Sequence, residues 1–191
     1  KGHHFPAVTL VAIVDADSGL FSPDFRGQEF MAQTITQVAG RAGRAERPGE
    51  VIVQSRHASH RILRLLSESN YVDLAKLLLA ERKIAVMPPY AQLALIKADG
   101  PQLKATIDLL KQIKSFSTQL IQQSESTISS IGPMPAPMEK RAGRYRSQLL
   151  FKATSKPIMQ RFLTQLVYQI ESLKVSTGVK WSLDVDPQEM I

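Results

Sequence analysis

The first part of the chain combines short apolar runs with one segment of helical periodicity. Residues 8–14 form a nearly continuous apolar and β-branched run, typical of a strand buried on both faces of a parallel sheet. Residues 51–53 form a second apolar run, and residues 25–39 between them have helical spacing. We therefore predict strand, helix and strand over residues 1–57, with the other strands of an α/β lobe expected upstream. The candidate core residues of the helix are Phe25, Phe30, Ile35 and Val38.

Apolar residues recur at the helical period from residue 57 to residue 82, which predicts a helical segment there. Residues 87–90, Met-Pro-Pro-Tyr, cannot continue a helix, because proline lacks the backbone donor and restricts the residue before it. We therefore place a domain boundary at this Pro-Pro hinge and interpret residues 58–90 as a helical linker. The apolar positions of the linker are Ile62, Leu65, Leu66, Leu74, Leu77 and Leu78.

Residues 91–191 show a clearer alternation of strand and helix patterns. A long loop is expected between the second and third strands, and Ser155 with Pro157 marks a helix start. The predicted order β-α-β-β-α-β is that of a ferredoxin-like domain. The predicted elements are strands over residues 91–98, 126–131, 147–153 and 179–185, a helix over residues 102–122, and a helix after Ser155 with Ile158, Phe162, Leu166, Ile170 and Leu173 on its buried face.

Composition is that of an ordinary globular protein, with 43% hydrophobic and 21% charged residues. The chain has no cysteine, which excludes disulfides and thiolate metal sites within it. The sequence contains no apolar run long enough for a membrane span. Its formal net charge is +7, and the excess is concentrated in residues 91–191, which hold 13 Lys and Arg against 8 Asp and Glu. Such an excess favours polyanionic partners, although ordinary solubilising charge is the alternative.

No self-contained active site is indicated, because the chain lacks a Gly-x-x-x-x-Gly-Lys-Ser/Thr phosphate loop and a cysteine nucleophile. Arg41 and Arg44 lie three residues apart among small residues and could present two guanidinium groups to one phosphate. An ordinary basic surface turn is the alternative. Asp15 and Asp17 follow the first strand, where open α/β sheets bind ligands, or else cap a turn. The contexts of His3, His4, His57 and His60 do not predict a metal site.

A second cationic cluster lies at residues 140–146, between two predicted strands. Lys140, Arg141, Arg144 and Arg146 are four cations in seven residues, and Tyr145 is the one aromatic residue among them. Cations bind backbone phosphates and a tyrosine ring can stack on a base. The cluster therefore predicts nucleic-acid binding, with a solvated hairpin tip as the alternative. The lone Trp181 is expected in the core or as an edge-strand anchor, with a stacking platform for a base as the alternative.

Several spaced strings carry a family resemblance. Residues 37–44, Gln-Val-Ala-Gly-Arg-Ala-Gly-Arg, resemble motif VI of superfamily 2 helicases. Residues 1–6 are similar to motif V of the replication-restart branch of that superfamily, the PriA family. Residues 15–17, residues 21–26 and the tail 179–187 follow in the same order as in that family. The resemblance covers essentially all 191 residues and implies a C-terminal piece of a longer protein.

The fold class that results is α/β plus α+β. The resemblance implies a partial RecA-like helicase lobe 2 in residues 1–57, a helical linker in residues 58–90, and a ferredoxin-like or ribosomal S10-like C-terminal domain in residues 91–191. It implies ATP and Mg²⁺ shared with a missing first lobe, and a zinc module upstream of this chain. Catalytic roles then fall to Arg44 as arginine finger, Arg41 and Gln37, and nucleotide contacts to Gly2, Gly40, Arg41 and Arg44.

The same resemblance implies DNA contacts by Lys1 and by the cluster of residues 140–146. It also places Lys156 and Gln160 in a pocket for the acidic tail of single-stranded DNA-binding protein, with other primosome proteins as further partners. The implied parent is a cytoplasmic, nucleoid-associated 3′-to-5′ DNA helicase that restarts replication at stalled forks, and this fragment is expected to be inactive by itself. A stand-alone nucleic-acid-binding module and a primosome-interaction scaffold, neither with ATPase activity, remain the alternatives.

Overall fold

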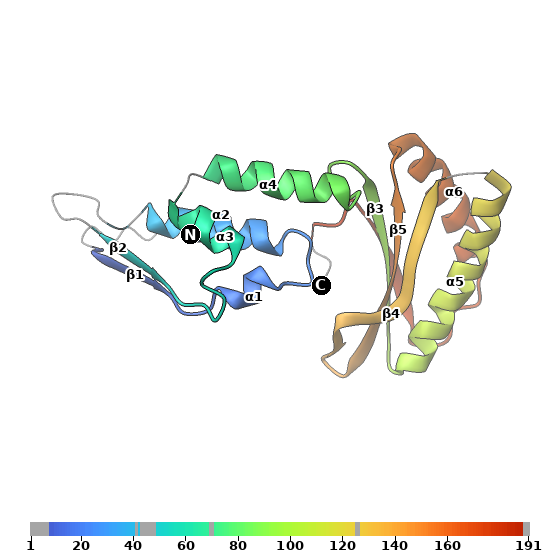
Figure 1. Cartoon of the computed structure of the whole chain (residues 1–191). Coiled ribbons are helices and arrows are strands. Elements are labelled where there is room, and N and C mark those ends of the chain that lie inside the picture. The colour runs from blue at the N-terminus through green and yellow to red at the C-terminus, as the bar shows by residue number, and fades with distance from the viewer. Residues whose placement is uncertain (1–7, 41, 43–48, 69–70, 125–126, 189–191) are drawn as a thin grey trace. The chain divides into compact units, whose positions relative to one another are not determined.

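The chain contains both helices and sheets, and it divides into two compact units, residues 1–81 and 82–191 (Figure 1). The computed structural model describes residues 8–40, 42, 49–68, 71–124 and 127–188. In that part of the chain, no helix has both the length and the hydropathy needed to cross a membrane. Each unit has its own hydrophobic cluster, so each is described by itself.

The first unit begins with the predicted strand, helix and strand. Strand β1 (Leu10–Ile13) pairs in parallel with β2 (Glu50–Val53), with Leu10 opposite Glu50. Helix α2 (Gly27–Ala39) connects the two strands, after the short helix α1 (Asp17–Leu20). A parallel pair requires such a crossover, so these elements form one β-α-β connection.

The expectation that residues 8–14 are buried on both faces is wrong for this structure. Leu10 is 54% exposed and Ile52 is 48% exposed. The described sheet contains β1 and β2, and the apolar cluster of the unit consists of helix residues rather than strand residues. The parallel direction of the strands is as the sequence indicates, but one sheet face has no described layer against it.

Helix packing forms the core of the first unit. The segment predicted as helical over residues 57–82 forms two helices, α3 (Arg61–Glu68) and α4 (Tyr71–Ile84). On α2 the buried residues include Ala32 and Ile35, whereas Phe30 is 47% exposed and is not the core residue that its type suggests. The buried members of the cluster are Leu20, Ala32, Ile62, Leu74 and Leu78.

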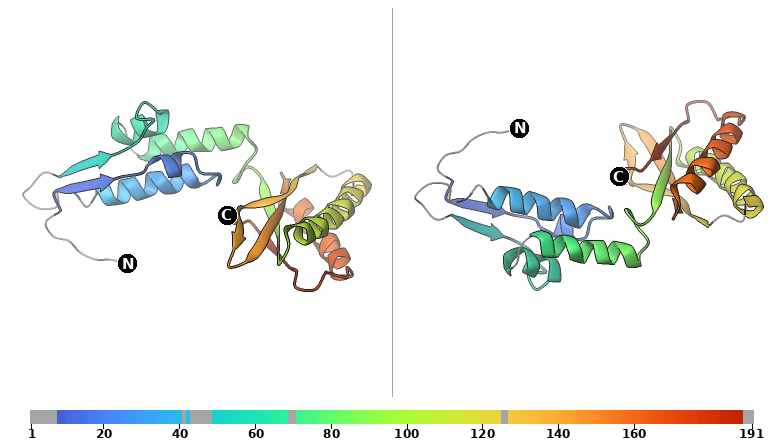
Figure 2. Two further views of the ribbon diagram at one scale, coloured as in Figure 1. Left: turned by 90° about the horizontal axis from the view of Figure 1, so that it is seen from below. Right: turned by 90° about the horizontal axis from the view of Figure 1, so that it is seen from above.

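The second unit has the predicted order of strands and helices, β-α-β-β-α-β. Its four-stranded sheet has the order β4-β5-β3-β6, and every neighbouring pair is antiparallel. Helices α5 and α6 cover one face of this sheet (Figures 1 and 2). The elements are β3 (Gln92–Gly100), α5 (Leu103–Ser124), β4 (Ile128–Arg141), β5 (Arg144–Ala153), α6 (Lys156–Glu171) and β6 (Lys180–Val185).

Alternate residues of the strands build the core beneath the helices. Phe151 of β5 is fully buried and contacts Phe162 of α6 edge to face, with ring centroids 5.0 Å apart. Trp181 packs against this cluster from the edge strand β6, as predicted. Since strand side chains alternate between faces, the neighbouring residues of each strand lie on the face away from the helices.

The connection between β4 and β5 differs from the predicted long loop. Strand β4 extends to Arg141, and Ala142 and Gly143 form a two-residue turn into β5. Strand β4 contains three prolines, which strands usually exclude, but it is an edge strand with register irregularities, where missing backbone donors are tolerated. These prolines are Pro133, Pro135 and Pro137.

We predict that Leu166→Ala destabilises the second unit by about 2–5 kcal/mol, because the truncated side chain leaves a cavity in a fully buried position. Urea unfolding followed by the fluorescence of Trp181, the single tryptophan, measures this unit selectively. Tyr168→Ala on the same helix is the matched control, since Tyr168 is 79% exposed. Equal effects of the two substitutions would contradict the assigned burial of α6.

Candidate functional site

The cationic cluster of residues 140–146 forms a tight hairpin rather than a loop. Arg141 pairs with Arg144 across the turn, and Lys140 pairs with Tyr145. Both turn residues have positive φ, 49° at Ala142 and 78° at Gly143, the combination of a two-residue turn that matches the strand twist. A Cβ at Gly143 would meet nothing within 4 Å, so glycine is needed there for its backbone conformation.

The members of this cluster have different surroundings. Lys140 and Arg141 are exposed at the hairpin tip. The ammonium group of Lys140 lies 4.9 Å from the centroid of the Tyr145 ring, a cation–π distance. Tyr145 and Arg146 are half-buried at the start of β5. The cluster therefore combines exposed charges with one aromatic ring that already has a cation beside it.

Arg144 is held by protein groups. Its Nε donates to Asp99 Oδ1 of β3, and its Nη2 donates to the carbonyl oxygens of Asp99 at 3.1 Å and Gly178 at 2.8 Å. The guanidinium group thus joins the end of β3 to the turn before β6. The prediction that Arg144 contacts DNA is not tested by these bonds, but its charge is already paired with Asp99.

Lys156 and Gln160 lie where the sequence places them, one turn apart near the start of α6. Both side chains are exposed. Ser155 occupies the N-cap position with extended backbone, but its side chain makes no capping hydrogen bond. The pair forms an accessible polar corner, whose proposed role in binding a partner tail stays a prediction.

A polar network joins the carboxyl ends of the two parallel strands in the first unit. Asp17 accepts hydrogen bonds from Ser55 Oγ at 2.5 Å and from the backbone N–H of Arg56 at 3.0 Å. These bonds, the Ser55 bond first, lower the pKa of Asp17 below its ordinary value of 3.8. Asp15 accepts from the N–H of Ser18, which supports the turn-capping alternative for that residue.

Aromatic contacts surround the same end of the sheet. The exposed ring of Phe21 contacts the rings of His57 and His60 edge to face, with centroids 4.7 and 6.1 Å apart. Among the described residues, no three His, Asp or Glu side chains are grouped closely enough to hold a metal ion. Here the two histidines act as packing partners.

Residues 37–40, the described start of the motif, lie at the opposite end of the parallel strands. Gln37 is exposed in the last turn of α2, and Gly40 is its C-cap residue. Both precede β2, whereas the Asp17 network follows it. Arg41 and Arg44, like Lys1 and Gly2, lie outside the described residues. The end of α2, with Gln37 and Gly40, and the acidic network therefore lie at different ends of the two strands.

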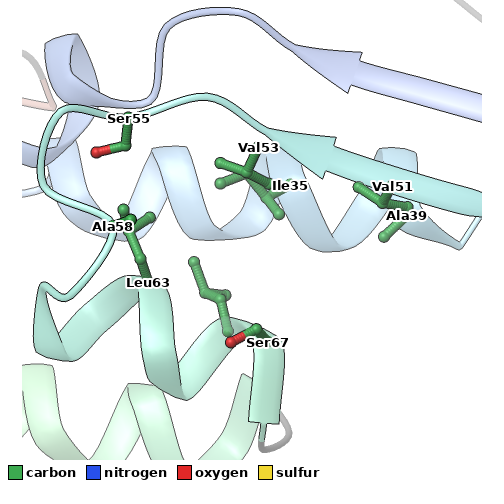
Figure 3. Close-up of a pocket in the computed structure, with 9 residues that line it drawn as sticks. Ile35, Ala39, Val51, Val53, Ser55, Ala58, Leu63 and Ser67 are labelled. Atoms are coloured by element: carbon green, nitrogen blue, oxygen red, sulfur yellow. The ribbon is translucent and has the colours of Figure 1, made fainter.

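A cavity of about 470 Å³ lies between α2, β2 and α3 (Figure 3). Ile35 of α2, Val51 and Val53 of β2, and Leu63 of α3 point into it. Its lining contains two serines and no charged residue. Such a lining does not suit a polyanionic nucleotide.

Two partners in these networks are not indicated by the sequence pattern. Ser55 bonds to Asp17 across 38 positions, and Asp99 pairs with Arg144 across 45 positions. Both depend on strand register, which a single sequence does not fix. The only available signal was the position of each residue at the end of a predicted strand.

We predict that Ser55→Ala raises the pKa of Asp17 toward 3.8, because the carboxylate loses its strongest hydrogen bond. An NMR titration of the Asp17 carboxyl measures the change, with Ser67→Ala as the matched serine control on α3. Since the folded pKa is lowered, the stabilisation by Asp17 is present above pH 3.8 and is lost as the pH falls through the lowered pKa. An unchanged titration in Ser55→Ala would refute the network.

Comparison with known proteins gives consistent matches over the whole chain. Proteins named "Replication restart protein PriA" are 44% identical over 100% of the chain in Haemophilus influenzae, 34% over 98% in Synechocystis and 31% over 100% in Bacillus subtilis. The chain spans about a quarter of the length of these relatives, 25%, 22% and 23%. Among solved structures, a de novo designed protein matches 52% of the chain with a TM-score of 0.36 and 11% identity, too low to support an argument.

A family model described as "Primosomal protein N C-terminal domain" matches residues 83–188, nearly the whole second unit. The matches to PriA proteins, which cover 98–100% of this chain, agree with it and include the motif of residues 37–44. The chain therefore belongs to the primosomal protein N (PriA) family, of which residues 83–188 form the C-terminal domain.

Proposed function

We propose that this chain is the C-terminal part of an ATP-dependent 3′-to-5′ DNA helicase that restarts replication at stalled forks and loads the primosome. The observation that carries the proposal is the match of the entire chain to proteins named for replication restart, at up to 44% identity. The cationic hairpin adds a chemical reason, because nucleic acids are bound largely through their phosphates.

In this proposal residues 91–191 are a ferredoxin-like, S10-like domain. The sheet order β4-β5-β3-β6 and the order β-α-β-β-α-β support that fold. Residues 1–57 are the last part of a RecA-like second lobe, which the parallel pair β1–β2 with its crossover supports. Residues 58–90 connect them, and α3 and α4 within this segment pack in the core of the first unit. The exposed outer face of β1 and β2 fits a lobe whose other layer comes from the rest of the protein.

ATP and Mg²⁺ are proposed as ligands shared with the first lobe of the parent protein. Arg44 would stabilise the developing charge on the transferred phosphate, with Arg41 and Gln37 beside it. The exposed position of Gln37, at the end of α2 and before β2, supports an outward-facing motif. At the start of α6, Lys156 and Gln160 would bind the acidic tail of single-stranded DNA-binding protein, since a lysine charge and the backbone N–H groups of a helix start both attract a carboxylate.

The simplest test of DNA binding uses the 191-residue chain. We expect it to bind forked and single-stranded DNA with an affinity that falls as salt rises, and the double variant Lys140→Ala/Arg141→Ala to bind more weakly with a shallower salt dependence. Lys104→Ala/Lys111→Ala on α5 removes the same charge from the helix side and is the control. Absence of salt-dependent binding by the wild-type chain would reject DNA binding by this region.

The helicase assignment is tested in the full-length protein. We expect Arg44→Ala to reduce DNA-stimulated ATP hydrolysis by about 10³-fold or more and to leave DNA affinity nearly unchanged, because an arginine finger acts on the transferred phosphate. Arg64→Ala, an exposed arginine of α3, is the control. Equal loss of both activities would instead indicate a structural role. Retained hydrolysis would favour a module that only binds nucleic acid or primosome proteins.

A further inference from the structure

The helix-free face of the second sheet carries a row of charged residues at its hairpin end. Asp99 of β3 lies directly opposite Arg146 of β5 on one side and Lys180 of β6 on the other. Residues paired in this way point to the same face. The adjacent Trp181 packs against the core beneath the helices, so the row lies on the opposite face.

The acid in the centre of this row is already paired. Asp99 accepts from Arg144 Nε, and the same guanidinium group also bonds to the carbonyl oxygens of Asp99 and Gly178. One side chain therefore neutralises Asp99 and fixes the end of β3 against the turn that leads into Lys180. Both side chains of the pair are about one-third exposed, 36% for Arg144 and 38% for Asp99.

This pairing leaves one cation on each side of a neutralised acid, Arg146 on β5 and Lys180 on β6. Within the described part of the chain, neither Arg146 nor Lys180 forms an ion pair, and Lys180 is exposed while Arg146 is half-buried. Their backbone positions are two strand spacings apart, about 10 Å, so each can bind a separate phosphate. The next charged residues on this face, Lys97 and Asp184, form an ion pair with 3.3 Å between Lys97 Nζ and Asp184 Oδ2.

Tyr145 lies on the other side of the sheet from this row. Neighbouring residues of a strand alternate between faces, so Tyr145 and Arg146 point in opposite directions. Lys140, its cross-strand partner, lies over its ring. A base bound beside Arg146 therefore has no aromatic platform from Tyr145.

We propose that Arg146 and Lys180 form a phosphate-binding pair on the helix-free face of the sheet, and that Arg144 is a positioning residue rather than a phosphate contact. The ligand class is the sugar-phosphate backbone of nucleic acid, bound without base recognition. This inference rests on the proposed DNA binding by residues 82–191. Compared with the cluster of residues 140–146, it adds Lys180 to the phosphate contacts, removes Arg144 from them and places Tyr145 away from the phosphate site.

The first experiment measures the salt dependence of binding of the 191-residue chain to fluorescent oligo(dT). Arg146→Gln and Lys180→Gln should each lower the slope of log affinity against log salt by about 0.7, and so weaken binding about five-fold at 0.1 M salt. Lys111→Gln on α5 should leave the slope unchanged, and Tyr145→Leu should leave affinity for oligo(dT) nearly unchanged. Trp181 fluorescence during urea unfolding checks that each variant is folded.

A second experiment distinguishes positioning from contact. Arg144→Ala should weaken binding, because the freed Asp99 carboxylate can then pair with Arg146 or Lys180. Adding Asp99→Asn to Arg144→Ala should restore the wild-type salt slope, since the two cations are uncompensated again. If Arg144 itself contacted phosphate, the double variant would stay as weak as the single one, and the assignment of Arg144 would be wrong.

The outcomes separate the inference from the proposed function. If the wild-type chain does not bind oligo(dT) in a salt-dependent manner, the proposed DNA binding fails and this site fails with it. If the wild type binds and folded Arg146→Gln and Lys180→Gln variants keep its slope, only the phosphate pair is rejected. The proposal is supported in full if Arg146→Gln and Lys180→Gln each lower the salt slope and Arg144→Ala/Asp99→Asn restores the wild-type slope.

Discussion

Antiparallel pairing along β3 is the constraint on which the second unit depends. This strand pairs with β5 over nine residues and with β6 over six, so it fixes the register of both neighbours. One set of alternate residues, which includes Ile96, is buried beneath α5 and α6. The other set, which includes Lys97 and Asp99, lies on the helix-free face. A one-residue change of register would exchange these faces.

The sequence was a good guide where periodicity was strong. The order of elements in residues 91–191 was predictable because long amphipathic helices alternate with apolar strands, and α5 and α6 begin within one or two residues of their expected starts. The sequence was a poor guide where tertiary packing decides which residues are buried and which strands pair. Phe30 is exposed because the core of the first unit lies between helices. A hairpin stands in place of the expected loop because prolines are excluded from central strands but not from edge strands.

The candidate sites show the same division. The residue types at positions 140–146 are enough to predict phosphate binding from the sequence alone. The sequence could not separate Arg144, which joins β5 to the end of β3 and to the turn before β6, from the cations that remain available. That distinction depends on Asp99 and Gly178, 45 and 34 positions away. Arg41 and Arg44, named on family resemblance, lie outside the described residues, and of their motif the structure places Gln37 and Gly40 at the end of α2.

The prolines of β4 have a consequence for association between molecules. An edge strand normally offers unpaired backbone donors to any other strand that meets it, and this promotes aggregation. Pro133, Pro135 and Pro137 occupy alternate positions of one edge and supply no backbone donor. That border of the sheet therefore offers fewer backbone donors for its continuation into a larger intermolecular sheet.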